Sequence, residues 1–152
     1  MAFILLLLIA GQAPADEVKA RKPGPDDKCP VCGMRSIKYP DFLSQAVLRN
    51  GTVLFFDGPK DLFKFHLQRD RYMPGERSAA VDEYIVTDYY EREPINARKA
   101  WYVMGSDVRG PMGRELVPFD HEEKAREFMQ DHRGQRILRF FDVNAATLGE
   151  LE

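Results

Sequence analysis

The chain has 152 residues, of which 44% are hydrophobic and 30% are charged. This length can fill one compact core or two small lobes, and it excludes a large multidomain enzyme. The 22 basic and 24 acidic side chains give a net charge of -2 without a dense basic block, so we expect no nucleic-acid partner.

The first fifteen residues have the pattern of an export signal. A short apolar run is followed by Ala13-Pro14-Ala15, the small-x-small sequence that signal peptidase recognises. The run is too short to cross a bilayer, and no lipid-accepting cysteine follows it. We therefore expect a cleavable signal peptide over residues 1–15, an exported protein and no stable membrane insertion. An uncleaved anchor is the alternative, because no basic residue precedes the apolar run.

A polar leader precedes the first predicted secondary structure. Residues 16–28 contain proline, glycine and charged side chains and have little to bury, so we predict a flexible leader, with order beginning near Cys29.

An Asn-Gly pair then joins two strand-like runs over 42–49 and 52–56, which is typical of a β-hairpin. A stripe of apolar residues at helical spacing predicts a helix over 59–68.

The rest of the chain repeats the order hairpin, helix, strand. A strand over 83–90 completes the first set. In the second set we expect a strand over 99–106, a loop over 109–113 and a strand over 115–119. A helix over 120–132 and a strand over 135–141 follow. Phe56-Asp57 and Phe119-Asp120 each stand nine residues before another phenylalanine, which suggests a duplicated ββαβ module.

Two aspartates stand at the starts of the predicted helices. Asp57 and Asp120 are interpreted as helix caps, and Asp120 has Glu123 at capping-box spacing. Together these patterns predict an α+β fold in which two related ββαβ lobes pack together. The expected boundaries are a first lobe over 29–96, a second lobe over 97–143 and a tail over 144–152.

The only two cysteines, Cys29 and Cys32, stand in the sequence Cys-Pro-Val-Cys-Gly-Met. A disulfide between them would close a very small loop and add little stability. A thioredoxin-type redox pair would need a helix N-terminus to lower a thiol pKa, and no helix is predicted after the second cysteine. A structural zinc site would need two further ligands, and the histidines at positions 66, 121 and 132 lack zinc-finger spacing.

A site for a soft metal ion would explain more residues of this segment than the three interpretations above. Met34 adds a thioether close to Cys32, and thiolate together with thioether is the ligand set that selects Cu(I). Met112, between a proline and a glycine in the predicted loop, has no evident packing role and is a second candidate thioether. Met104 is a weaker candidate, because methionine in a strand more often fills a core. Cu(I) is favoured, while the disulfide, redox and zinc interpretations stay open.

Four motifs occur in one order along the chain: Cys-Pro-Val-Cys-Gly-Met, a Phe-Phe-Asp turn into a helix, an Ala-Trp-Tyr-Val strand and a Gly-Pro-Met-Gly-x-x-Leu-x-x-Phe loop. With these motifs the chain resembles the NosL family from about Cys29 to Phe141. Members of this family are periplasmic copper-binding proteins that help to mature the copper centres of nitrous oxide reductase. The resemblance implies two ββαβ lobes similar to those of the organomercurial lyase.

The resemblance also implies a ligand set and a function. One Cu(I) ion would be held by Cys32, Met34 and Met112, with Cys29 as a further candidate ligand. The chain would be a periplasmic, monomeric metallochaperone that delivers copper to a copper enzyme, with nitrous oxide reductase as the expected client. Many family members are lipoproteins, and in this respect the chain departs from the family pattern.

Alternatives from other classes remain beside this interpretation. A thiol-disulfide oxidoreductase or a lyase-like enzyme would use Cys29 and Cys32, and a small zinc-binding structural protein would use them as ligands. A lyase needs a carboxylate beside the thiols as a proton donor, and the sequence shows no obvious acid partner. We therefore expect a metal-binding accessory protein and not an enzyme.

Overall fold

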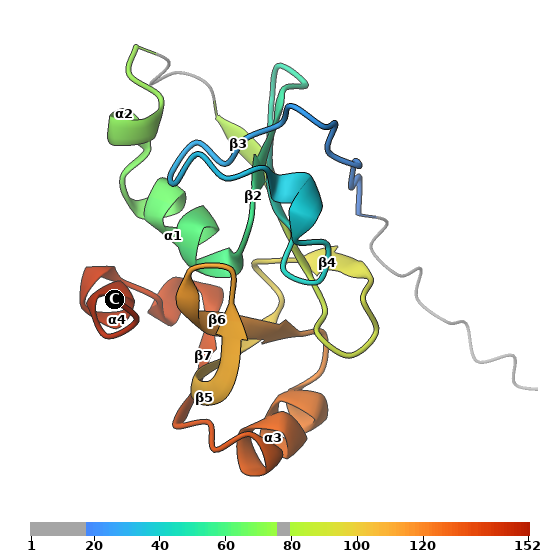
Figure 1. Ribbon diagram of the computed structural model, residues 1–152, viewed down its shortest axis with the longest axis vertical. Helices are drawn as coiled ribbons and strands as arrows, with labels where there is room; N and C mark the ends of the chain where they lie inside the picture. Colours follow the sequence, from blue (N-terminus) through green and yellow to red (C-terminus); the bar gives the residue numbers. More distant parts are fainter. Residues whose placement is uncertain (1–17, 76–79) are drawn as a thin grey trace, which may run out of the picture.

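The computed structural model describes residues 18–75 and 80–152. It is an α+β fold with two antiparallel sheets, one from the first half of the chain and one from the second (Figure 1). The predicted fold class is confirmed. None of the helices in these two ranges is long and apolar enough to cross a membrane. The predicted signal peptide over residues 1–15 lies outside the described residues.

The first sheet has the strand order β2-β1-β3-β4, and each neighbouring pair is antiparallel. Its strands are β1 (Ser44–Leu48), β2 (Val53–Phe56), β3 (Val81–Thr87) and β4 (Pro94–Asn96). β1 and β2 form the predicted hairpin, in which Gly51 supplies the positive φ of the turn. The sequence does not predict β4, because three residues that begin with a proline carry no strand pattern.

Helical segments flank this sheet. A 3₁₀ turn, Ser36–Lys38, precedes β1, and two helices, α1 (Pro59–Leu67) and α2 (Arg69–Tyr72), connect β2 with β3. Pro59 at the first helical position suits the start of α1, since its missing N–H would have no partner there. The predicted helix over 59–68 is therefore confirmed to within one residue.

The second sheet has the strand order β6-β5-β7 and is also antiparallel. Its elements are β5 (Trp101–Gly110), β6 (Gly113–Phe119), α3 (Glu122–Asp131), β7 (Arg136–Arg139), a 3₁₀ turn (Phe140–Asp142) and α4 (Ala145–Gly149). The predicted loop over 109–113 is shorter than expected, because β5 and β6 extend until only Pro111 and Met112 remain between them. Met112 consequently stands at the tip of a long hairpin.

The two halves share the larger hydrophobic core. Phe63 on α1 packs against Tyr102 of β5, with ring centroids 5.1 Å apart, and against Phe140, at 4.9 Å. A smaller core lies under α3, formed by Val103, Val117, Phe119, Ala125 and Phe128. The helices and strands run β1, β2, α1, α2, β3, β4 in the first half and β5, β6, α3, β7, α4 in the second, and α1 packs against side chains from both halves. This packing brings β6 against α1.

The described part of the leader contacts the first sheet. The backbone N–H of Arg21 donates to Gln45 Oε1 at 2.9 Å, and its guanidinium donates to the carbonyl of Gly51 at 3.1 Å. Lys28 forms an isolated antiparallel bridge with Arg35. Arg21 therefore lies against the β1–β2 hairpin, and Lys28 leads directly into the cysteine segment.

The prediction that Asp57 and Asp120 cap helices is wrong. Gly58 and His121 occupy the N-cap positions of α1 and α3, and neither helix has a side-chain cap bond there. Asp57 instead faces the cysteines, and Asp120 forms an ion pair with Lys124 at 3.1 Å. Sequence spacing identifies a polar residue near a helix start, but it does not say which way the side chain points.

Candidate metal centre

The cysteine segment folds into a tight loop that turns both sulfurs to one side. The N–H of Gly33 donates to the carbonyl of Cys29, and the N–H of Cys29 donates to the carbonyl of Met34, each at 2.8 Å. Gly33 has φ 79°, a conformation that a residue with a side chain rarely adopts. Both cysteines are free thiols. The loop therefore presents two sulfur ligands without a disulfide between them.

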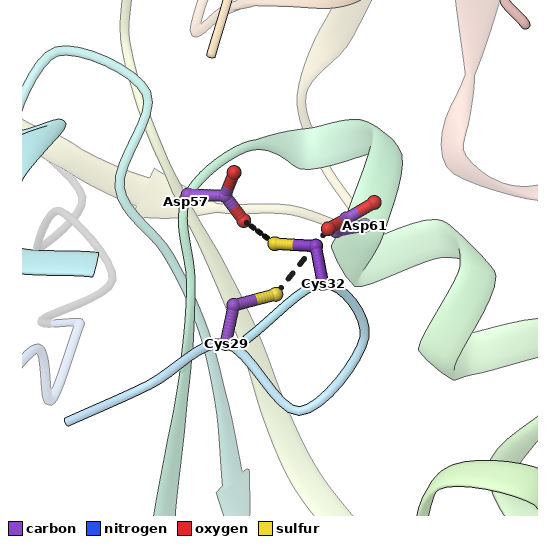
Figure 2. A group of neighbouring side chains, drawn as sticks. All are labelled: Cys29, Cys32, Asp57 and Asp61. Carbon is purple, nitrogen blue, oxygen red and sulfur yellow. Dashed lines mark hydrogen bonds between the residues drawn. The ribbon is translucent and has the colours of Figure 1, made fainter. Parts of the chain in front are cut away.

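Two aspartates face these thiols from the junction of β2 and α1 (Figure 2). Cys29 Sγ donates to Asp61 Oδ2 at 3.3 Å, and Cys32 Sγ donates to Asp57 Oδ1 at 3.1 Å. One ligand atom from each of the four residues lies within 4.8 Å of the others. The expectation that the thiols have no acid partner is therefore wrong.

The cluster is buried, and burial raises the pKa of both thiols and of the Asp61 carboxyl. Cys29, Asp57 and Asp61 are at most 2% exposed, while Cys32 is half-buried. Burial raises the pKa of the Cys32 thiol to about 12 and raises the pKa of the Cys29 thiol further. Burial, together with the neighbouring charge of Asp57, also raises the pKa of the Asp61 carboxyl. A redox-active thiol needs a lowered pKa, so this environment disfavours the oxidoreductase interpretation.

Two carboxylate oxygens in the cluster are left without hydrogen-bond donors. Asp57 Oδ2 and Asp61 Oδ1 are buried and accept no hydrogen bond in the described structure; only Lys64 Nζ stands near Asp61 Oδ1, at 3.8 Å. Buried polar atoms without partners are unfavourable, and a bound cation would satisfy them. The donor set, two thiols and two carboxylates, fits a metal ion.

The cluster opens to solvent through a pocket on the Cys32 side. The pocket is lined by Cys32 and Asp61 from the cluster and by side chains that include Tyr72, Lys64, Glu152 and Met112. Lys64 and Glu152 pair at the pocket with their charged atoms 2.7 Å apart. Cys32 is the thiol that a second protein or a small ligand can reach, since Cys29 is only 1% exposed.

The structure brings Met112 to the same pocket as Cys32. Met112 is 43% exposed at the tip of the β5–β6 hairpin, 78 residues further along the chain than Met34. Its backbone carbonyl accepts a hydrogen bond from Lys60 Nζ at 2.9 Å. The hairpin tip is thus attached to the first turn of α1, the helix that carries Asp61.

A buried glutamate reinforces this attachment. Glu115 Oε1 accepts hydrogen bonds from the backbone N–H of Lys60 at 2.6 Å and of Leu116 at 2.9 Å. It supplies the acceptor that no cap side chain provides at the start of α1. Burial raises the pKa of Glu115 to about 8. Gly58 makes room for it, because a Cβ at that position would overlap Glu115 Oε2.

The other methionines named in the sequence analysis lie elsewhere. Met34 is half-buried, and its sulfur accepts a hydrogen bond from the hydroxyl of Tyr39 at 3.7 Å, outside the lining of the Cys32 pocket. Met104 is 2% exposed and belongs to the larger core. The structure therefore groups Cys29 and Cys32, places Met112 in the lining of the Cys32 pocket and leaves Met34 outside that lining.

Asp57 and Asp61 are the site residues that the sequence analysis missed. They are four residues apart, one directly after a strand and the other in the first turn of a helix. The sequence analysis interpreted Asp57 as a helix cap and did not single out Asp61. The sequence does hold a signal that could have identified them. Two carboxylates four residues apart follow a predicted strand, and the chain has only two cysteines for which they could be partners.

A small α+β protein in which two thiols and two carboxylates converge below an open pocket is a candidate metal-binding protein. The NosL family model matches residues 20–148 of the chain, which is most of its length. The chain therefore belongs to the NosL family. The family membership predicted from the four sequence motifs is confirmed.

Two relatives extend this result. The copper-binding lipoprotein NosL of Stutzerimonas stutzeri is 30% identical over 128 residues, which cover 82% of this chain and 65% of that protein. The chain thus spans less than two thirds of the length of this curated relative. The crystal structure of the copper chaperone NosL from Shewanella denitrificans matches with a TM-score of 0.68 and 26% identity, over 88% of this chain and 99% of that one. Both relatives are named for copper, one as a copper-binding lipoprotein and the other as a copper chaperone.

Proposed function

We propose that the protein binds copper as Cu(I) and passes it to a copper-receiving enzyme, as a metallochaperone. The observation that carries this proposal is the pair of thiol sulfurs at one buried point, opening onto a pocket that Met112 also lines. Thiolate and thioether sulfur are the ligands that select Cu(I) among metal ions of the cell. The names of the two relatives, a copper-binding protein and a copper chaperone, support the same metal.

The proposed ligands are Cys29, Cys32, Met34 and Met112. Cys32 and Met112 need the least rearrangement, because both line one pocket. Cys29 lies deeper and donates its thiol proton toward Asp61, so it binds after losing that proton. Met34 joins only by leaving the hydroxyl of Tyr39.

Transfer of the metal takes place on the Cys32 side. An incoming ligand from the partner approaches through the pocket, binds the ion together with Cys32 and Met112, and then displaces them. Exposure supports this order, since Met112 is 43% exposed and Cys29 is 1% exposed. Cys29 is then the last ligand to let go, which keeps the ion bound until the partner holds it.

Membership of the NosL family supports a proposal for the partner and the compartment. We propose nitrous oxide reductase, or its maturation complex, as the receiver and the periplasm as the place of transfer. The signal-like segment over residues 1–15 supports export. The protein acts as a monomer without stable membrane insertion.

A competition titration tests the proposal. The reduced protein is titrated with Cu(I) and with Zn(II) against chelators of known affinity. We expect preference for Cu(I) and its loss in the double variant Cys32→Ala, Met112→Ala. Met129→Leu, on α3, is the matched control for replacing a methionine. Preference for zinc, or copper binding that survives the double variant, would contradict the proposal.

Zinc is a second candidate cargo, because the structure supplies the two ligands that the sequence did not. Two thiolates and two carboxylates within 4.8 Å of one another are a complete tetrahedral set for Zn²⁺. The variants Asp57→Asn and Asp61→Asn separate the two metals. If zinc is the cargo, each variant removes a ligand and weakens zinc binding much more than Cu(I) binding, for which the aspartates only accept hydrogen bonds from the thiols.

A further inference from the structure

We propose that a second pocket, beside the β5–β6 hairpin, binds a small oxyanion such as phosphate, sulfate or a free carboxylate. The donors that line it are Ser106, Arg109, Arg114 and Gln135. Glu150 and Leu151 also line this pocket, whereas the next residue, Glu152, lines the pocket of Cys32. The two pockets are therefore neighbours at the C-terminal end of the chain. The proposal goes beyond copper binding and stands without it.

Two arginines place uncompensated positive charge in this pocket. Arg109 of β5 and Arg114 of β6 are directly opposed in the sheet register, and both line the pocket. Like charges that face each other across a strand pair are destabilising. Arg114 donates to the carbonyl of Glu150 at 3.2 Å. The side chain of Arg109 has no hydrogen bond or ion pair with a residue in the described part of the chain.

A buried hydroxyl in the same pocket lacks a partner. Ser106 is 9% exposed, and its Oγ makes no hydrogen bond to any described residue. Leaving a buried hydroxyl unpaired is unfavourable, and an anion within reach would remove that penalty. This second observation is independent of the arginines, since it concerns a neutral group on the pocket wall.

A glutamine amide completes the set of donors. A Cβ at Gly105 would lie 2.7 Å from Cδ of Gln135, so the glutamine side chain crosses the strand where glycine leaves space. Gly105 also has φ 81°, which glycine adopts readily. The backbone of β5 is thus shaped to hold Gln135 at the pocket.

The one carboxylate in the pocket does not cancel this charge. Glu150 Oε2 accepts a hydrogen bond from the guanidinium of Arg136 at 2.7 Å and is therefore neutralised by a separate cation. The groups left to act on a ligand are two guanidiniums, a hydroxyl and an amide. Guanidinium groups form paired, charge-assisted hydrogen bonds with oxyanions, which fits this set.

An NMR titration of the full chain tests the proposal. Backbone amide shifts are followed while inorganic phosphate, sulfate or acetate is added at constant ionic strength, with chloride as the reference salt. We expect saturable shifts confined to residues 104–114 and 135–150. Stronger binding of phosphate and sulfate than of acetate would assign a tetrahedral anion, and the reverse order would assign a carboxylate.

Variants decide whether the pocket is the site. Arg109→Gln and Ser106→Ala should each weaken binding by about tenfold, the effect of one hydrogen bond to a charged group. Arg49→Gln removes the same charge from the other sheet and should leave binding unchanged. In chloride alone Ser106→Ala should fold with at least native stability, because it removes an unpaired group. Shifts that do not saturate, or affinities equal in Arg109→Gln and Arg49→Gln, would overturn the proposal.

Discussion

A Phe-Asp pair stands at the end of a strand in each half of the molecule, and the environment of the aspartate differs between the two halves. Asp57 follows Phe56 and is fully buried against Cys32, whereas Asp120 follows Phe119 and keeps a side chain that is 31% exposed. Asp120 pairs with Lys124 at the surface. A helix begins within two residues of the aspartate in both halves, so the presence of a helix does not explain the difference.

What differs is the segment that covers each aspartate. The loop that carries Cys29 and Cys32 packs over Asp57, and the described part of the second half contains no cysteine. The second half contributes in another way, because its hairpin brings Met112 and Glu115 to α1. The first half of the chain therefore supplies the cluster, and the second half supplies the hairpin that stands beside it.

Removing the thiols should have the largest effect. In the double variant Cys29→Ser, Cys32→Ser we expect Cu(I) affinity to fall by at least about ten-thousandfold, since thiolate metal sites hold on the order of 10 kcal/mol of binding free energy. Chelator competition measures the affinity, and circular dichroism checks the fold. A loss of less than tenfold would show that copper binds away from this loop.

The buried carboxyl of Glu115 should make stability depend on pH. Its pKa is about 8 in the fold and near 4.5 when unfolded, so the folded state binds the proton more tightly. The stabilisation is complete below pH 4.5 and is lost as the pH rises toward 8, by on the order of 4 kcal/mol. Urea unfolding of the native protein and of Glu115→Gln across this range measures the difference. A difference that stays constant with pH would refute a protonated Glu115.

A change of side chain should cost far more stability at Gly58, the N-cap residue of α1, than at His121, the N-cap residue of α3. Gly58→Ala forces a Cβ onto Glu115 and should destabilise the fold by about 2 kcal/mol. His121→Ala, at the equivalent N-cap position of α3, should change stability by no more than about 0.5 kcal/mol. Equal effects in thermal unfolding would mean that Glu115 does not need the space beside Gly58.

The smallest effect is expected at Asp120. Asp120→Ala removes an ion pair that is partly exposed and should lower stability by at most about 1 kcal/mol. Cu(I) affinity should stay unchanged, because Asp120, unlike Asp57, makes no hydrogen bond with a thiol in the described structure. An altered copper affinity in this variant would show that the second half of the chain also holds metal.

Periodic and turn patterns predicted most of the fold. The hairpin at Gly51, α1 and the strands of the second sheet agree with the sequence, because each is set by neighbouring residues. Elements of three to five residues, such as β4 and α4, are not predicted, since they form only when packed against the rest. The cysteines are evident from the sequence, but the burial of Asp57 and Asp61 depends on contacts between distant segments.

X-ray absorption spectroscopy of the copper-loaded protein tests the central claim most directly. We predict Cu(I) with only sulfur in its first coordination shell, and one sulfur fewer in Met112→Leu than in the native protein or in the control Met129→Leu. A shell that contains oxygen from Asp57 or Asp61, or a spectrum that Met112→Leu leaves unchanged, would contradict a copper site made of the cysteine loop and the distant hairpin.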